Sequence, residues 1–70
     1  MKINYFPDTD TLYLELSTNK VIETKDLNEN TIIDIDAHGN LVALTLEHAQ
    51  ELANLTDFSF RQVLTQPQPA

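Results

Sequence analysis

The stretch TIIDIDAHGNLVALTL, residues 31–46, decides which fold we predict for this chain. Hydrophobic residues occupy every second position on both sides of its centre: Ile33, Ile35, Val42, Leu44 and Leu46. Alternation with a period of two is typical of a strand with one buried face. The only glycine of the chain, Gly39, lies between the two segments, where a hairpin of this loop length needs a residue at positive φ. We therefore predict an antiparallel hairpin that turns at residues 36–40.

Alternation also predicts three earlier strands, at residues 2–6, 11–16 and 21–25. The third of these strands carries charged side chains, which is typical of a sheet edge, and a loop over residues 26–30 is expected to follow it. After Leu46 the hydrophobic spacing becomes helical, which predicts a short amphipathic helix over residues 47–55. The predicted fold is an α+β domain, an antiparallel meander of four to five strands with one short C-terminal helix packed on one face. The predicted core consists of Ile3, Tyr5, Leu12, Leu14, Leu16, Ile33, Ile35, Val42, Leu44, Leu46, Ala49 and Leu52.

The chain divides into three parts by composition. Residues 1–55 are expected to form a single small domain, residues 56–65 an aromatic C-terminal extension, and residues 66–70 a disordered tail. In the extension, Phe58 and Phe60 alternate as in a strand, yet a helix that begins at Thr56 or Asp57 also fits. The sequence leaves the two alternatives for residues 57–65 open.

The composition restricts the possible partners. Four basic and eleven acidic residues give a net charge of −7, and the basic residues are scattered, so direct binding to nucleic acid or to an anionic membrane is not expected. The charge suits a basic protein partner. Cysteine is absent, which excludes disulfides and cysteine metal sites. No signal peptide or membrane span is predicted, and the expected location is the cytoplasm.

Acidic residues at the hairpin tip raise the question of a metal site. Asp34, Asp36 and His38 mimic the start of a calcium-binding loop, but Thr45 stands where such a loop has its bidentate glutamate. We interpret Asp36 and Asn40 as shaping the turn while Gly39 supplies the positive φ, and a weak metal or ligand site at Asp34, Asp36 and His38 is the alternative function. A second pair, Asp8 and Asp10, is interpreted as capping the turn after Pro7, and whether the two pairs meet stays open.

We expect neither catalytic activity nor a bound cofactor. The sequence has no nucleophile motif and no phosphate-binding glycine loop, and so small a chain has little room for a substrate pocket of about 300 Å³ or more. A 70-residue chain buries only about 60% of its unfolded surface, so reinforcement by a homodimer is expected. The candidate interface residues are Tyr13, Ile32, Leu41, Phe58 and Phe60, and the two phenylalanines are expected to pack against the sister chain.

The sequence also resembles a small bacterial family, domain of unknown function 2283. The resemblance covers residues 1 to about 50 and rests on Lys2, Ile3, Tyr5, Pro7, Asp10, Leu12, Tyr13, Leu16, Glu23, Thr24, Ile33, Asp34, Ile35, Asp36, Gly39, Leu41, Val42, Leu46 and Ala49. Ala43 and Thr45 depart from it, since similar sequences often have glycine and an acidic residue there. The family has no established catalytic or binding residues. The resemblance implies a small antitoxin-like protein, since some members are encoded beside small toxin-like proteins. The predicted function is thus a small acidic interaction module that neutralises a basic partner.

Overall fold

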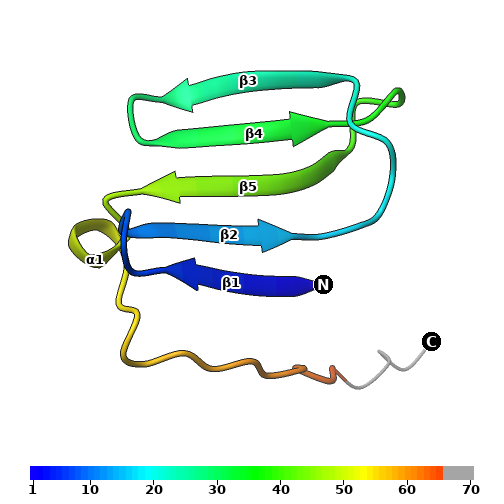
Figure 1. The fold of residues 1–70 in the computed structure, drawn as a ribbon. Coiled ribbons are helices and arrows are strands. Elements are labelled where there is room, and N and C mark those ends of the chain that lie inside the picture. Colours follow the sequence, from blue (N-terminus) through cyan, green and yellow to red (C-terminus); the bar gives the residue numbers. More distant parts are fainter. Residues whose placement is uncertain (66–70) are drawn as a thin grey trace.

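The computed structural model describes residues 1–65, which form one antiparallel sheet, one turn of helix and an extended C-terminal segment (Figure 1). The elements are β1 (Lys2–Phe6), β2 (Thr11–Glu15), β3 (Glu23–Asn28), β4 (Thr31–Ile35), β5 (Leu41–Glu47) and α1 (Ala49–Leu52). The predicted α+β class is confirmed, and the hairpin predicted from residues 31–46 is the β4–β5 pair. The prediction for residues 66–70 lies outside the described residues.

The strands lie in the order β1-β2-β5-β4-β3, and every neighbouring pair is antiparallel. The predicted meander is therefore right only in part, because β5 lies between β2 and β4 rather than at an edge. Residues 16–22 allow this order by connecting β2 to β3 across one end of the sheet (Figure 1). The Leu16 amide at the start of this connection donates to the carbonyl of Val42 at 2.8 Å. The longest and most buried strand thereby lies at the centre of the sheet.

β3 occupies a later part of the sequence than predicted. The alternation favours residues 21–25, whereas the strand is Glu23–Asn28 and includes residues expected to form a loop. A tight turn pairs Asn28 directly with Thr31, and the Asn28 side chain accepts a hydrogen bond from the Asn30 amide at 2.9 Å. Pairing with β4 therefore outweighs the polar composition of residues 26–28. The predicted edge position is confirmed.

The helix is much shorter than the predicted span of residues 47–55. His48 precedes it with a φ of 55°, the His48 side chain makes no capping hydrogen bond, and Ala53 after it is already extended. The single turn lies beside the ends of β2 and β5 (Figure 1). Four residues of helix span about 6 Å, whereas the axes of the two edge strands of a five-stranded sheet lie about 19 Å apart, so α1 is too short to cross the sheet. Among residues 1–65, no helix has the length and the apolar character that crossing a membrane requires.

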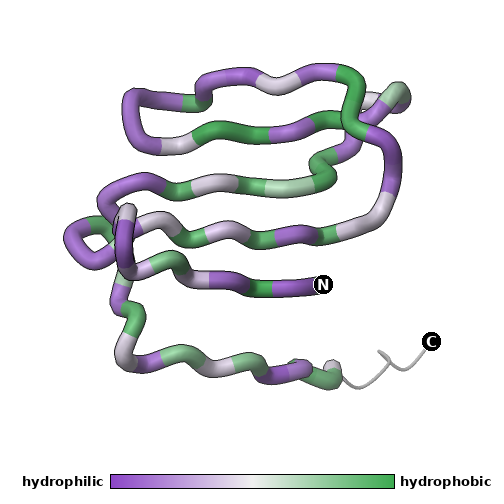
Figure 2. Tube along the Cα trace, in the orientation of Figure 1, coloured by the Kyte–Doolittle hydropathy of each residue, from purple (hydrophilic) through white to green (hydrophobic). Residues whose placement is uncertain are grey.

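The strand register gives the sheet two faces, because directly paired residues point to the same side. We call one of them the apolar face, which is formed by Ile3, Tyr5, Leu12, Leu14, Leu44, Leu46, Ile33 and Ile35. Figure 2 shows the corresponding alternation of hydrophobic and hydrophilic residues along the strands. On β3 this side of the sheet carries charged residues, since Lys25 pairs with Ile33. The Lys25 Nζ lies 3.5 Å from a carboxylate oxygen of Glu23.

The apolar face is only partly buried, and the predicted core is right for Val42 and Ala49 but wrong for Ile3, Leu16 and Leu52, which are exposed. Within residues 1–65, no large side chain is fully buried, and the buried hydrophobic residues are Val42, Ala43 and Ala49. Of the predicted core, Leu16 and Leu52 are 41% and 52% exposed. The pattern identifies the apolar face correctly, but residues 1–65 provide no complete second layer over it.

The C-terminal extension forms neither of the predicted alternatives, strand or helix. It continues from α1 as an extended segment that runs back beside β1 (Figure 1). Leu55 is half-buried, whereas Phe58 and Phe60 are 69% and 77% exposed. The extension thus presents large apolar side chains to solvent.

Candidate protein-interaction site

The second face of the sheet, which we call the acidic face, combines an uncharged centre with carboxylates around it. Its side chains are Lys2, Asn4, Phe6, Thr11, Tyr13, Glu15, Ala43, Thr45, Glu47, Ile32, Asp34, Thr24 and Asp26. The register places Tyr13 opposite Thr45 and Thr45 opposite Ile32. Neighbouring strands lie about 4.8 Å apart, so these three side chains form one continuous row across β2, β5 and β4.

Four carboxylates surround this row. Glu15 and Glu47 lie on β2 and β5, and Asp34 and Asp26 lie on β4 and β3. The Thr24 hydroxyl donates to Asp34 Oδ1 at 2.7 Å, which fixes that carboxylate on the face. Among the strand side chains of this face, the one cation is that of Lys2, on the edge strand β1. The acidic face therefore carries a net negative charge next to an uncharged centre.

The acidic character continues beyond the end of β5. An open hollow of about 480 Å³ is lined there by Glu29, Asn30, Glu47, His48 and Glu51. The Glu47 amide donates to the carbonyl of Asn30 at 2.7 Å, which connects the end of β5 to the β3–β4 turn. The three glutamates of this hollow extend the negatively charged surface of the acidic face.

The structure brings together two of the predicted interface residues and separates the others. Tyr13 and Ile32 are both half-buried and belong to the same row. Leu41 pairs instead with Ile35 across a β-bulge, away from that row. Phe58 lies over the opposite side of the sheet, where it lines a hollow together with apolar-face side chains, and Phe60 is exposed.

The hairpin-tip acids are arranged for structure. Asp36 is only 5% exposed, and its Oδ1 accepts hydrogen bonds from the amides of His38 and Asn40, both at 2.9 Å. Its Oδ2 accepts a hydrogen bond from the Asn19 side chain at 3.0 Å. The hydrogen bond from the Asn40 backbone, followed by those from Asn19 and His38, lowers the pKa of Asp36 below its ordinary value, against the effect of desolvation.

These bonds leave the predicted metal candidates without a common site. Asp34 is held by Thr24 on the acidic face, and Asp36 is occupied by the turn and by Asn19. Over the part of the chain that the structure describes, no three His, Asp or Glu side chains gather as metal ligands would. The arrangement supports the interpretation of Asp36 as turn-forming, whereas Asp34 is a residue of β4.

Asp10 has a role that the sequence does not reveal. Its φ is 53°, and its Oδ1 accepts hydrogen bonds from the Tyr5 hydroxyl at 2.7 Å and from the Gln50 amide at 3.1 Å. Its backbone carbonyl accepts a hydrogen bond from the Ala49 amide at 3.0 Å. The bond to Asp10 is also the main cause that raises the pKa of Tyr5. Asp10 therefore joins the β1–β2 turn to α1, a contact that no local pattern marks.

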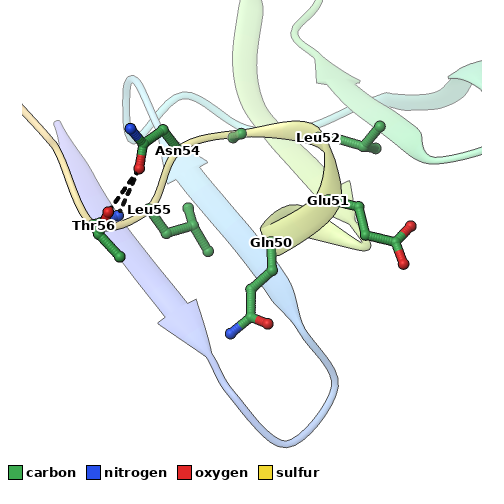
Figure 3. Close-up of a pocket in the computed structure, with 7 residues that line it drawn as sticks. Gln50, Glu51, Leu52, Asn54, Leu55 and Thr56 are labelled. Carbon is green, nitrogen blue, oxygen red and sulfur yellow. Dashed lines mark hydrogen bonds between the residues drawn. The ribbon is translucent and has the colours of Figure 1, made fainter.

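The segment after α1 forms a further open hollow, of about 580 Å³, that carries no catalytic grouping. Its lining is Gln50, Glu51, Leu52, Ala53, Asn54, Leu55 and Thr56. Leu55 points toward β1 and β2 (Figure 3), whereas the Leu52 side chain is exposed. The Asn54 side chain accepts hydrogen bonds from the amide and hydroxyl of Thr56, at 3.2 and 2.8 Å. This short turn directs the chain from α1 toward the apolar face.

The fold and the two faces define a class: a small α+β protein built on a single antiparallel sheet with one acidic and one apolar face. A family model described as "Protein of unknown function (DUF2283)" matches residues 2–50. The chain belongs to this family, as the resemblance predicts. No curated protein and no solved structure that was compared matches the chain. The match ends within α1, so the C-terminal extension lies outside the family's common part.

Proposed function

We propose that the protein is a small, non-catalytic interaction module whose acidic face binds a small basic protein, in the manner of an antitoxin. The observation that carries the proposal is the row of Tyr13, Thr45 and Ile32 with carboxylates on four strands around it. Protein interfaces commonly have an aromatic or aliphatic centre inside a polar rim, and tyrosine is enriched among the residues that contribute most binding energy. The centre supplies affinity, and the rim selects the charge of the partner.

The net charge supports a basic partner over other partners. A chain at −7 attracts cations from a distance and repels nucleic acids and anionic membranes. Glu15 and Asp34 flank the buried Ala43 on the acidic face, so a lysine or arginine that approaches there meets two carboxylates at once. Membership of the family adds no partner, since its description gives no function.

Affinity capture from an extract of the native cells tests the proposal. Tagged protein is expected to retain a small basic protein, whose affinity is then measured by calorimetry with purified components. Tyr13→Ala should raise Kd about 30-fold or more, the effect of losing a residue worth about 2 kcal/mol. Glu15→Gln should raise Kd and weaken its salt dependence.

Two exposed control positions lie off the acidic face. Glu23→Gln removes one carboxylate from the edge strand, and Leu27→Ala trims a side chain that is 62% exposed. Both should leave Kd unchanged. Capture of no basic protein, or equal affinity of the Tyr13→Ala and wild-type proteins, would contradict the proposal.

The alternative function, a metal or ligand site at the hairpin tip, is less well supported. Both carboxylate oxygens of Asp36 already accept hydrogen bonds, Oδ1 from the amides of His38 and Asn40 and Oδ2 from Asn19, and an ion would compete with these bonds. Titration with calcium, zinc and manganese separates the two functions. A micromolar isotherm that Asp36→Ala abolishes would reverse their order.

A further inference from the structure

We propose that a second copy of this chain packs against the apolar face, and that Phe58 and Phe60 of both copies are part of the contact. The proposal concerns the side of the sheet opposite the acidic face and is independent of the function proposed for that face. It starts from the incomplete cover of the apolar face. A sheet with one hydrophobic side reaches a stable arrangement by packing that side against a second layer.

The chain supplies only part of that layer. A hollow of about 320 Å³ separates the extension from the sheet, and its lining is Ile3, Tyr5, Leu12, Leu14, Ala53, Asn54, Leu55 and Phe58. Phe58 of the extension therefore lies next to apolar-face side chains of β1 and β2. No helix or strand of residues 1–65 lies over β4 and β5 (Figure 1), where Ile33, Ile35, Leu44 and Leu46 remain half-exposed.

Charge favours a second copy as the occupant. Two chains at −7 repel each other wherever their carboxylates meet, and the acidic face cannot face its own copy without that repulsion. The apolar face has uncharged side chains on β1, β2, β5 and β4, and at β3 its charges are the opposed pair Lys25 and Glu23. A basic partner gains nothing there, whereas a second copy finds a surface that matches its own.

The available area is close to what a stable dimer needs. The partly exposed side chains of the apolar face together have at most about 400 Å² left to bury. Phe58 and Phe60 are 69% and 77% exposed, and an aromatic side chain buries about 150–250 Å². The sum approaches the roughly 800 Å² per partner of a standard interface, and two sheets packed face to face about 10 Å apart provide a known geometry for it.

Light scattering and sedimentation equilibrium on the full chain at micromolar concentration test the proposal. The expected mass is twice 7.9 kDa. Leu44→Lys and Thr45→Lys introduce the same charge at neighbouring positions on opposite faces of β5, and only Leu44→Lys should give a monomer. The Tyr13→Ala variant should remain a dimer, so the outcome is separate from that of the partner-binding experiment.

A variant with both Phe58→Ser and Phe60→Ser keeps the proposal testable if Leu44→Lys fails to fold. The extension has no regular secondary structure, so these substitutions leave the sheet intact, and they should raise the dimer Kd at least tenfold. Phe6→Ser, at an exposed aromatic position on the acidic face of the edge strand β1, is the matched control and should leave the dimer Kd unchanged. A single species of 7.9 kDa in the wild type, dissociation by Thr45→Lys but not by Leu44→Lys, or a dimer insensitive to the double substitution would overturn the proposal.

Discussion

Replacement of Gly39 by alanine measures the cost of one left-handed residue at the hairpin tip. Gly39 has a φ of 80°, and a Cβ atom built there meets no other atom within 4 Å. Its amide donates to the carbonyl of Asp36 at 3.1 Å, which closes a turn with aspartate at the first and glycine at the fourth position. An L-residue in this conformation costs about 1–2 kcal/mol. Since 1 kcal/mol shifts Tm by about 4–8 °C in a chain of this size, L-alanine should lower Tm by about 4–16 °C.

The mirror-image residue provides the control. A 70-residue chain is accessible to chemical synthesis, and D-alanine at position 39 prefers the φ that Gly39 adopts. It should keep or raise the stability, by about 0.4–1 kcal/mol, because it restricts the unfolded chain without strain in the folded one. Both proteins are compared by circular dichroism at one fixed concentration, since association shifts Tm. Equal losses with L- and D-alanine would show that lack of space, rather than φ, requires glycine, and would refute the reasoning.

Three further predictions follow from the burial and the hydrogen bonds. The pKa of Asp36 is lowered from 3.8 in the folded state, so the contribution of this carboxylate to stability is present above about pH 4 and is lost as pH falls through the folded pKa. Asp36→Asn should therefore flatten the decline of Tm between pH 6 and 2. The pKa of Tyr5 is raised, so absorbance titration of a Tyr13→Phe variant, which keeps Tyr5 as its one tyrosine, should show ionisation above pH 10. The stability that this shift contributes is complete below pH 10 and is lost as pH rises further. Ionisation at the ordinary value of 10.0 would contradict the prediction. Val42→Ala should cost about 2 kcal/mol in urea unfolding. Leu41→Ala, at a side chain that is 39% exposed against 4% for Val42, should cost less than half as much, and equal costs would place Val42 outside the core.

The β1–β2 and β4–β5 hairpins could be predicted because the sequence signals for them are local. In β4 and β5 the alternating hydrophobic residues identify the strands, and Asp36 and Gly39 have the side chain and the conformational freedom that the turn needs. β3 lacks such a signal. Its residues are exposed along its whole length, so its position is set by pairing with β4 across the turn after Asn28. The predicted helix is too long because hydrophobic spacing carries no information about the positive φ of His48.

The candidate site could be predicted in composition but not in arrangement. Alternation alone places Tyr13 and Ile32 on the side opposite the hydrophobic residues of their strands. Their neighbourhood depends on β5 lying between β2 and β4, which brings Thr45 between them and which nothing in the local sequence requires. The hydrogen bond from the Gln50 amide to Asp10 is even harder to predict from local sequence, because it joins residues 40 positions apart.

A single sheet with chemically different faces has a consequence for the two proposed contacts. Self-association through the apolar face buries leucine and isoleucine side chains and leaves the carboxylates of the acidic face in solvent. Because the two faces point in opposite directions, a dimer formed in this way has both acidic faces on its outside, each with its row of Tyr13, Thr45 and Ile32. The partner contact then neither competes with the dimer contact nor needs it to open. Dimerisation would instead favour partner binding indirectly, because a layer packed on the apolar face stabilises the sheet that holds the row in place.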